Sequence, residues 1–317
     1  MNKRIEIEKK YFCTNDEGLL KLIHKNKLKK IDESIEIDEY FTDINSEFVR
    51  NRTCLRIRKK NNNYMELTFK GKSKDFFNSY AKIENNIVLK IEQYENIIDI
   101  LYALGYLSYT IVDKKRITYS KEKDNITYNV MIDNIKSIGN FVEFELLYEN
   151  DDKSIEDLKV LLNNFVDSFK NLNFESADLP YRDFVARKKS LDILPVNNLK
   201  NIILDLNNID IANKFMININ LLKMLRRKGI KLFLIIKNNL NDIVQKYELN
   251  ELFEEIIIKD DLNNKIIKNI EPLESVILTD INYEINNIKT IKISNGNNQD
   301  SMINLSSILL IIINYVG

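Results

Sequence analysis

Apolar and charged positions alternate along short segments in the first half of the chain. At its start, Glu6, Glu8 and Lys10 occupy every second position. Successive side chains of a β-strand point to opposite faces, so these charges share one face, and Ile5 and Ile7 share the other. The alternation therefore predicts a β-strand with one ionic and one apolar face.

Later segments repeat this pattern. Leu55-Arg56-Ile57-Arg58 places two guanidinium groups on one face and two aliphatic groups on the other. An unpaired buried charge is prohibitive, but cations and carboxylates that face each other across a shared interior compensate one another. The pattern predicts an antiparallel barrel with an ionic interior and apolar outer faces packed under helices. The alternative is a set of half-exposed strands with solvated charged faces. The other segments with this spacing are 67–72, 82–84, 114–116, 131–133 and 142–145.

The pattern changes in the second half, where apolar runs alternate with helical periodicity. Such an order predicts βαβ units and a small Rossmann-like α/β domain with a parallel sheet. We expect a first domain at 1–190, a linker at 191–198 and a second domain at 199–317, each with its own core. The expected strands are 202–206, 231–236, 256–258, 275–279 and 290–293, and the expected helices are 219–228 and 302–315.

Composition narrows the function classes. Lys plus Arg equals Asp plus Glu at 47 each among 317 residues, whereas a nucleic-acid-coating protein would carry a basic excess. The two cysteines, Cys13 and Cys54, lie among strand residues, which favours buried reduced thiols over a disulfide. His24 is the single histidine and falls in the amphipathic segment 18–27, where a surface position is expected.

Neither end of the chain predicts a membrane segment. The start enters a strand directly and has no secretory leader pattern. The apolar stretch 305–316 is too short to span a bilayer and contains Ser306 and Asn314, which indicates a packed terminal helix. We therefore expect a cytoplasmic protein without a nucleic-acid or membrane partner.

The Glu-x-Glu-x-Lys start resembles the signature of the CYTH superfamily, the triphosphate tunnel metalloenzymes. Later segments follow in the order of that family, and the resemblance covers residues 3–187. It implies an α+β fold built on an eight-stranded antiparallel tunnel barrel. The matching segments are Asp38-Glu39-Tyr40-Phe41, Leu55-Arg56-Ile57-Arg58, Thr68-Phe69-Lys70-Gly71, Lys82-Ile83-Glu84, Leu104-Gly105-Tyr106, 112–119, 130–133 and Gly139-Asn140-Phe141-Val142-Glu143-Phe144-Glu145.

The resemblance also implies the roles of the charged positions. Arginine forks and lysine ammonium groups would bind a triphosphate, and the carboxylates would hold one or two Mg²⁺ or Mn²⁺ ions. The implied substrate clamp is Lys10, Arg56, Arg58, Lys70, Lys82, Lys114 and Arg116. The implied metal ligands are Glu6, Glu8, Asp133, Glu143 and Glu145, with Glu84 as a lesser candidate. The implied catalytic set is Glu6, Glu8, Lys10, Glu143 and Glu145.

Two positions depart from the family pattern. The family commonly has Arg at the position of Lys82, which keeps the charge but loses the bidentate fork. It often has an acid at the position of Asn86, so one secondary carboxylate is missing.

Three functions fit these residues. A metal-dependent triphosphatase that cleaves the terminal phosphoanhydride of inorganic triphosphate, a nucleoside triphosphate or another organic triphosphate is favoured, because hydrolysis requires only a clamp and a water molecule. A class IV adenylate cyclase would use the same clamp, with a ribose hydroxyl as the nucleophile. The third is a non-catalytic module that senses a triphosphate.

Residues 199–317 resemble the haloacid-dehalogenase phosphatases, particularly the small carboxy-terminal-domain branch. Asp205 matches the nucleophile of that family, whereas Asn207 stands where a general acid is needed and has no titratable proton to give. Asp280 is what remains of a later acidic pair. The resemblance implies a catalytically inactive domain with a possible protein partner. We also expect a fragment cut after Ser190 to fold and keep the activity of the tunnel.

Overall fold

The computed structural model describes residues 5–14, 16–71, 84–149, 153–172, 174–194, 198–205, 211–236, 249–258, 270–279, 288–293 and 305–316. The chain folds into two compact units. Unit 1 comprises residues 1–41, 47–100 and 111–185, and unit 2 comprises residues 42–46, 101–110 and 186–317. The division falls within helix α5 (Tyr181–Ile193), which also extends into the segment predicted as a linker.

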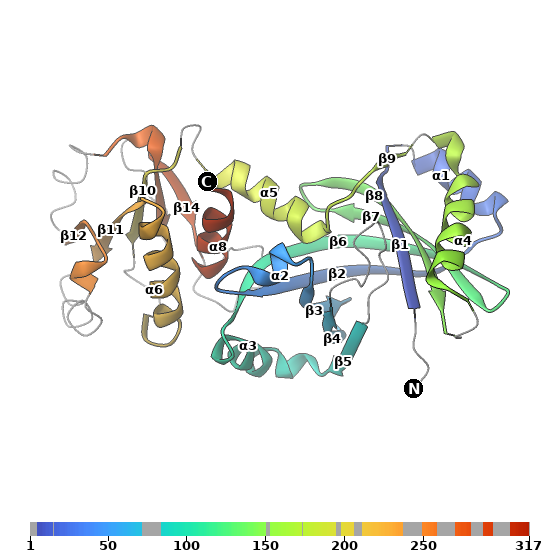
Figure 1. Cartoon of the computed structure of the whole chain (residues 1–317), viewed down its shortest axis with the longest axis horizontal. Coiled ribbons are helices and arrows are strands. Elements are labelled where there is room, and N and C mark those ends of the chain that lie inside the picture. Colours follow the sequence, from blue (N-terminus) through green and yellow to red (C-terminus); the bar gives the residue numbers. More distant parts are fainter. Residues whose placement is uncertain are drawn as a thin grey trace. The chain divides into compact units, whose positions relative to one another are not determined.

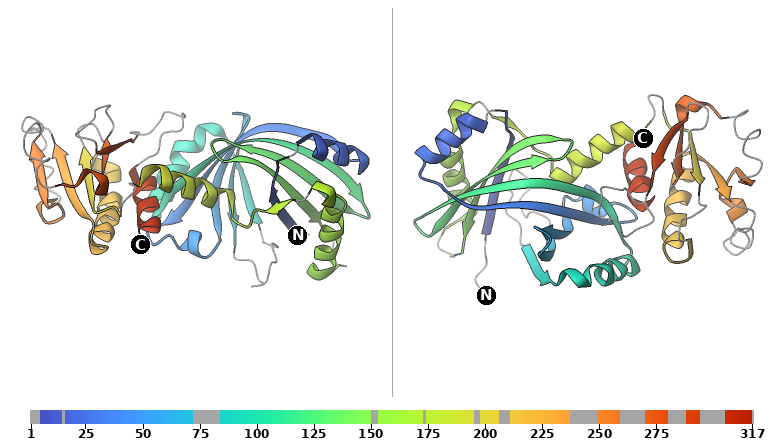
Figure 2. Two further views of the ribbon diagram at one scale, coloured as in Figure 1. Left: turned by 90° about the horizontal axis from the view of Figure 1, so that it is seen from above. Right: turned by 180° about the vertical axis from the view of Figure 1, so that it is seen from behind.

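Most of unit 1 is a curved antiparallel sheet (Figure 2). Among the described residues it has nine strands in the order β5-β4-β3-β2-β6-β7-β8-β1-β9. This arrangement confirms the predicted antiparallel, tunnel-like sheet, although eight strands were expected and the described residues form nine, the ninth being the two-residue β9. The strands are β1 (Ile5–Phe12), β2 (Lys29–Asp43), β3 (Cys54–Lys60), β4 (Tyr64–Lys70), β5 (Glu84–Leu89), β6 (Tyr106–Lys123), β7 (Ile126–Ile135), β8 (Gly139–Tyr148) and the two-residue β9 (Glu175–Ser176).

α-Helices lie between or after several strands of this sheet in the order of the chain (Figure 1). Ser154 begins α4 with a capping box, because its hydroxyl accepts a hydrogen bond from the backbone N–H of Asp157 while the Asp157 carboxylate accepts from the backbone N–H of Ser154. The helices are α1 (Asp16–Lys25), α2 (Glu47–Arg50), α3 (Tyr94–Ala103), α4 (Ile155–Asp167) and α5, with 3-10 turns η1 (Ile91–Gln93) and η2 (Lys170–Leu172).

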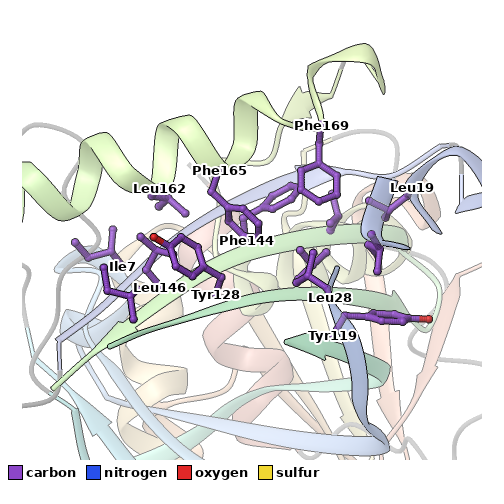
Figure 3. Packing of buried hydrophobic residues seen from close by; sticks show 14 of the residues in the cluster. Ile7, Leu19, Leu28, Tyr119, Tyr128, Phe144, Leu146, Leu162, Phe165 and Phe169 are labelled. Carbon is purple, nitrogen blue, oxygen red and sulfur yellow. The ribbon is translucent and has the colours of Figure 1, made fainter. Parts of the chain in front are cut away.

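The outer face of β1, β6, β7 and β8 is apolar and packs against α1 and α4. Ile7 and Phe144 lie in this apolar packing (Figure 3). Ile7, Val130 and Phe144 are 2%, 0% and 0% exposed. Phe165 of α4 meets Phe144 edge-on, with ring centroids 5.7 Å apart. This packing confirms, for these four strands, the prediction that the aliphatic faces lie under helices, whereas Phe69 of β4 and Ile87 of β5 are exposed. The alternate, charged positions of the same strands form the inner face.

An apolar cluster occupies one end of the inner face. Tyr40, Phe141 and Tyr181 are buried in it, and Val112 and Ile135 pack beside them. The strand members of this cluster lie at the same alternate positions as the charged residues, farther along each strand. The first turn of α5 is therefore anchored where the ionic part of the inner face ends.

Unit 2 contains a parallel sheet, as the sequence predicts. Its described strands have the order β12-β11-β10-β13-β14, and every neighbouring pair is parallel. They are β10 (Asn201–Asp205), β11 (Lys231–Ile236), β12 (Glu255–Ile258), β13 (Ser275–Thr279) and β14 (Lys289–Lys292). The helices are α6 (Ile211–Arg227) and α8 (Leu305–Tyr315), with 3-10 turns η4 (Leu249–Glu251) and η7 (Pro272–Glu274).

The start of α6, the exposure of His24 and of the two cysteines, and the packing of α8 were also predicted from the sequence. α6 begins eight residues before the predicted start, at Ile211 rather than 219. His24 is exposed and Cys13 is buried, as expected, but Cys54, the first residue of β3, is only half-buried. α8 is a packed helix, as predicted, and no helix in the described part of the chain is long and apolar enough to cross a membrane.

Candidate functional site

Strand register gathers the predicted charged residues on the inner face of unit 1. Lys10 lies opposite Glu143, and Glu8 lies opposite Glu145. The intervening Lys9 is on the other face, where its ammonium donates to Asn163 of α4 at 2.5 Å. The two-residue spacing in the sequence therefore predicts correctly which charges of β1 share a face.

Three carboxylates form the most acidic part of this face. One oxygen each of Glu6, Glu8 and Glu145 lies within 4.8 Å of the other two. Burial raises the pKa of Glu6 to about 8, with Glu8 and Glu145 adding to the shift and Lys70 opposing it. Burial and neighbouring carboxylates also raise the pKa of Glu145. Hard oxygen ligands that repel one another at this distance suit a divalent cation such as Mg²⁺ or Mn²⁺.

Lys70 connects this acidic cluster to β5. Its ammonium lies 3.1 Å from Glu6 and 3.0 Å from Glu84. Burial opposes the charge of Lys70, but Glu6, Glu8 and Glu84 outweigh that effect and raise its pKa. Glu84 thus has a cation as its close partner in this structure.

A second group of charges lies on β2, β3 and β6. Arg58 binds Asp38 through two parallel hydrogen bonds, Nε to Oδ1 at 2.6 Å and Nη2 to Oδ2 at 2.7 Å. Lys114, which is 2% exposed, lies 3.1 Å from Glu36 and 3.6 Å from Asp38. Arg56 lies 3.7 Å from Asp38. Burial would raise the pKa of Asp38, but Arg58, Arg56 and Lys114 hold it well below its usual value.

A third group centres on Arg116. This guanidinium binds Asp133 at 2.6 and 2.5 Å and Glu143 at 2.5 Å. Tyr181 donates its hydroxyl to the same Asp133 at 2.7 Å, and the ammonium of Lys10 lies 4.2 Å from the centroid of the Tyr181 ring. Asp133 and Glu143 therefore share the Arg116 guanidinium as a cationic partner.

Three residues of this site are absent from the sequence-based set. Glu36 and Asp38 show the same alternate spacing as Glu6 and Glu8, so their spacing also predicts two carboxylates on one face of a strand. Tyr181 carries no such signal, because its role depends on where α5 begins against the sheet. Asn86, at the position of the missing acid, lies opposite Thr68 and is exposed. Lys82 lies outside the described residues.

Unit 2 places Asp205 at the carboxyl end of its middle strand, β10. The residue is fully buried, and Thr279 of the neighbouring β13 donates its hydroxyl to Asp205 at 3.3 Å. In open α/β sheets this edge of the central strands is where ligands bind. Asn207 and Asp280, the other residues singled out in this half, lie outside the described residues.

Comparison with protein families decides the identity of the first half. The CYTH domain model matches residues 4–179, more than half of the chain. The chain belongs to the CYTH family. This family includes triphosphatases and adenylate cyclase-like proteins. The family assignment agrees with the antiparallel sheet and the ionic inner face described above.

Three solved structures similar to this CYTH chain each match between 56% and 58% of it. The PH1819 protein of Pyrococcus horikoshii is 22% identical, with a TM-score of 0.46, and the match covers 58% of this chain and 99% of that one. A putative adenylate cyclase from Vibrio parahaemolyticus is 15% identical, with a TM-score of 0.45 and coverage of 57% and 98%. A putative adenylyl cyclase from Hippeastrum, described as revealing a dominant triphosphatase activity, is 13% identical, with a TM-score of 0.43 and coverage of 56% and 92%. No curated protein matches the chain.

Proposed function

We propose that the CYTH domain is a metal-dependent triphosphatase that hydrolyses the terminal phosphoanhydride of inorganic triphosphate, a nucleoside triphosphate or another organic triphosphate. The observation that supports this proposal is that a close carboxylate cluster and several arginine and lysine groups lie on the same inner face. A carboxylate cluster of Glu6, Glu8 and Glu145 lies on β1 and β8, and arginine and lysine groups lie on β3, β4 and β6. The arginine and lysine groups of such a face would bind the negative oxygens of a polyphosphate, and its carboxylates would bind the accompanying cation.

The cations of this face are suited to phosphate oxygens. Arg58 and Arg116 each hold a carboxylate through two parallel hydrogen bonds, the geometry that a guanidinium also uses for phosphate. Their side chains are 16% and 11% exposed, and that of Lys70 is 19% exposed, so all three retain accessible surface. We propose that these groups, with Lys10, Arg56, Lys82 and Lys114, bind the triphosphate.

The carboxylate cluster fits a resident divalent cation. Glu6, Glu8 and Glu145 would hold it, since one oxygen of each already lies within 4.8 Å of the other two. The bound ion would neutralise phosphate charge and lower the pKa of a water molecule. Asp133, Glu143 and Glu84 were also predicted as ligands. Asp133 and Glu143 lie beside Arg116, which favours a role in holding that cation, and Glu84 shares Lys70 with Glu6.

The residues of the chain would contribute orientation and electrostatic stabilisation to the reaction. In hydrolysis a water oxygen bonds to the terminal phosphorus, the bridging P–O bond breaks, and negative charge grows on the leaving oxygen. Cations already fixed by Asp38 and Asp133 need little reorganisation to stabilise that charge. Glu36 adds a second carboxylate beside Arg58, and the Tyr181 hydroxyl helps to hold Asp133.

Product analysis tests this function. The purified full-length chain should release phosphate from inorganic triphosphate and convert ATP to ADP and phosphate with Mg²⁺ or Mn²⁺, and a chelator should abolish both reactions. Cyclic AMP with pyrophosphate would instead identify an adenylate cyclase. Tight binding of ATP without turnover would identify a sensing module.

For unit 2 we propose a catalytically inactive, phosphatase-like module that could bind a protein partner. The supporting observations are the parallel sheet and the position of Asp205 at the carboxyl edge of β10. Asn207, which cannot act as a general acid, argues against activity. Glu8→Gln removes the expected tunnel activity, so that any remaining phosphatase activity can be assigned to unit 2. In this variant, release of phosphate from a phosphomonoester should be undetectable, and Asp205→Asn should change nothing.

A further inference from the structure

A neutral side chain extends the carboxylate cluster by one strand. Asn129 of β7 lies directly opposite Glu145 of β8, and Glu145 lies directly opposite Glu8 of β1. The three residues thus form a row across neighbouring strands on the inner face. Asn129 is 6% exposed, so its amide is removed from bulk solvent.

The amide group of Asn129 uses only one of its two ends. Its Nδ2 donates to Glu145 Oε2 at 2.7 Å. This hydrogen bond fixes the orientation of the amide, because only the nitrogen can donate to a carboxylate. The hydrogen bond favours the charged form of Glu145 and offsets part of the rise in pKa that burial causes. Within the described part of the chain, the buried Oδ1 has no hydrogen-bond partner.

An unpaired buried carbonyl oxygen is costly, and its closest charged neighbour in the row cannot relieve it. Ionised Glu145 and Glu8 are acceptors only, so neither can donate to Oδ1. A divalent cation satisfies all of these oxygens together, either directly or through the O–H groups of its bound water. Amide oxygens are ordinary ligands of such ions.

We infer that Asn129 supplies a fourth, neutral oxygen to the cation site formed by Glu6, Glu8 and Glu145. The two polar atoms of its amide have different roles. Nδ2 donates a hydrogen bond that orients Glu145, and Oδ1 faces the ion or the water bound to it. This inference rests on the proposed metal-dependent function, and it adds a ligand that lies outside the acidic motifs of the sequence.

Binding of Mn²⁺ to the full-length chain without substrate tests this role, with free Mn²⁺ measured by electron paramagnetic resonance. Asn129→Ala removes both ends of the amide and should weaken binding at least about tenfold. Asn129→Asp removes the donor but keeps an oxygen and adds a charge, so it should bind Mn²⁺ as tightly as the wild type or more tightly. Asn129→Ser provides a second small variant should the alanine variant not fold.

Ser120→Ala is the matched control, because Ser120 lies opposite Asn129 on β6, on the side away from Glu145. It should bind Mn²⁺ like the wild type. Unchanged binding in Asn129→Ala and Asn129→Ser would overturn the inference, and so would an aspartate variant as weak as alanine, since the amide would then only orient Glu145. If the wild type does not bind Mn²⁺, the metal-dependent function itself is wrong, and the role of Asn129 falls with it.

Discussion

The Lys70 ammonium lies 3.1 Å from Glu6, although the strands that carry them are far apart in the order of the sheet. Lys70 is on β4 and Glu6 is on β1, which are each second from opposite ends of the nine described strands. An ion pair between them requires the sheet to curl until its two ends approach each other. The inner face therefore encloses its charges, and the low local dielectric strengthens their interactions.

The first prediction concerns this ion pair. Lys70→Met keeps much of the side-chain length but removes the charge between Glu6 and Glu84. The two carboxylates then lose their shared partner, and the pKa of Glu6 should rise further, because Lys70 lowers it in the wild type. We expect triphosphate turnover to fall at least about tenfold and the midpoint of thermal unfolding to decrease.

Lys9→Met is the control for that variant. Lys9 is on the same strand as Glu6 but on the outer face, where it contacts Asn163. Turnover should remain close to that of the wild type. A loss at Lys9 as large as the loss at Lys70 would mean that the assignment of inner and outer faces is wrong.

The second prediction concerns the carboxylate cluster. Glu8→Gln keeps the shape of the side chain and removes one negative charge from the close group with Glu6 and Glu145. Turnover with Mg²⁺ or Mn²⁺ should fall at least about a hundredfold, as expected for loss of a dominant electrostatic group. Circular dichroism should show an unchanged fold. Turnover near that of the wild type would exclude this cluster as the centre of the reaction.

The sequence predicts the faces of unit 1 better than it predicts the partners on them. Strand periodicity is local, so Arg56 and Arg58 could be assigned to one face from their spacing alone. The spacing of Asp38 places it on the same face, but it does not show that Asp38 pairs with these arginines. That pairing depends on the register between β2 and β3, over a separation of twenty residues. Alternation along single strands thus predicts the ionic inner face, whereas the ion pairs on that face depend on how distant strands pair.

Tyr181 shows a different limit. It lies outside every alternating strand segment, and it reaches Asp133 only because α5 begins at the apolar end of the inner face. Nothing local in Leu179-Pro180-Tyr181 indicates which strand it will contact. In unit 2, by contrast, apolar runs bounded by helices were sufficient to predict a parallel sheet, since such strands are buried on both faces.

The third prediction concerns the fork of Arg58. Arg58→Lys keeps the positive charge but cannot bind both oxygens of Asp38 in parallel. We expect roughly 1–3 kcal/mol less stability toward urea and a clear fall in turnover, because Asp38 is fully buried and needs both donors. Lys115→Ala, which removes an exposed ion pair with Glu33, should change stability little. Equal effects of the two variants would contradict this view.

The fourth prediction concerns pH and Asp133. Burial alone would raise the pKa of this carboxyl, but Arg116, Lys114 and the Tyr181 hydroxyl outweigh burial and lower it to about 2. The folded-state pKa is thus below the unfolded value of about 3.9. Ionised Asp133 therefore stabilises the folded state above about pH 4, and this contribution is lost as the pH falls toward 2.

Asp133→Asn cannot titrate, so it isolates this effect. The difference in unfolding free energy between wild type and variant should be constant above about pH 4 and should narrow by about 2 kcal/mol on acidification to pH 2. Urea unfolding across this pH range measures it. Curves that stay parallel down to pH 2 would show that Asp133 has an ordinary pKa in the folded protein.

The last prediction concerns a chain cut after Ser190. Unit 2 includes residues 42–46 and 101–110 as well as the C-terminal part. Within it, Ser307 of α8 donates to the backbone carbonyl of Tyr109 at 2.5 Å, and Asn314 donates to the Ser46 hydroxyl at 2.9 Å. Tyr109 and Ser46 are 1% and 2% exposed. A fragment of residues 1–190 would lose these partners and expose surface that is buried in the full chain.

We therefore expect the fragment to unfold at a lower temperature than the full chain and to lose part of its turnover, in contrast to the independent fold that the sequence predicts. Asp205→Asn in the full chain is the control, because it leaves α8 and its hydrogen bonds intact and an amide oxygen can still accept from Thr279. That variant should match the wild type in unfolding temperature and turnover. A fragment that matches the full chain in both would show that residues 42–46 and 101–110 are stable without α8, and that each half folds alone.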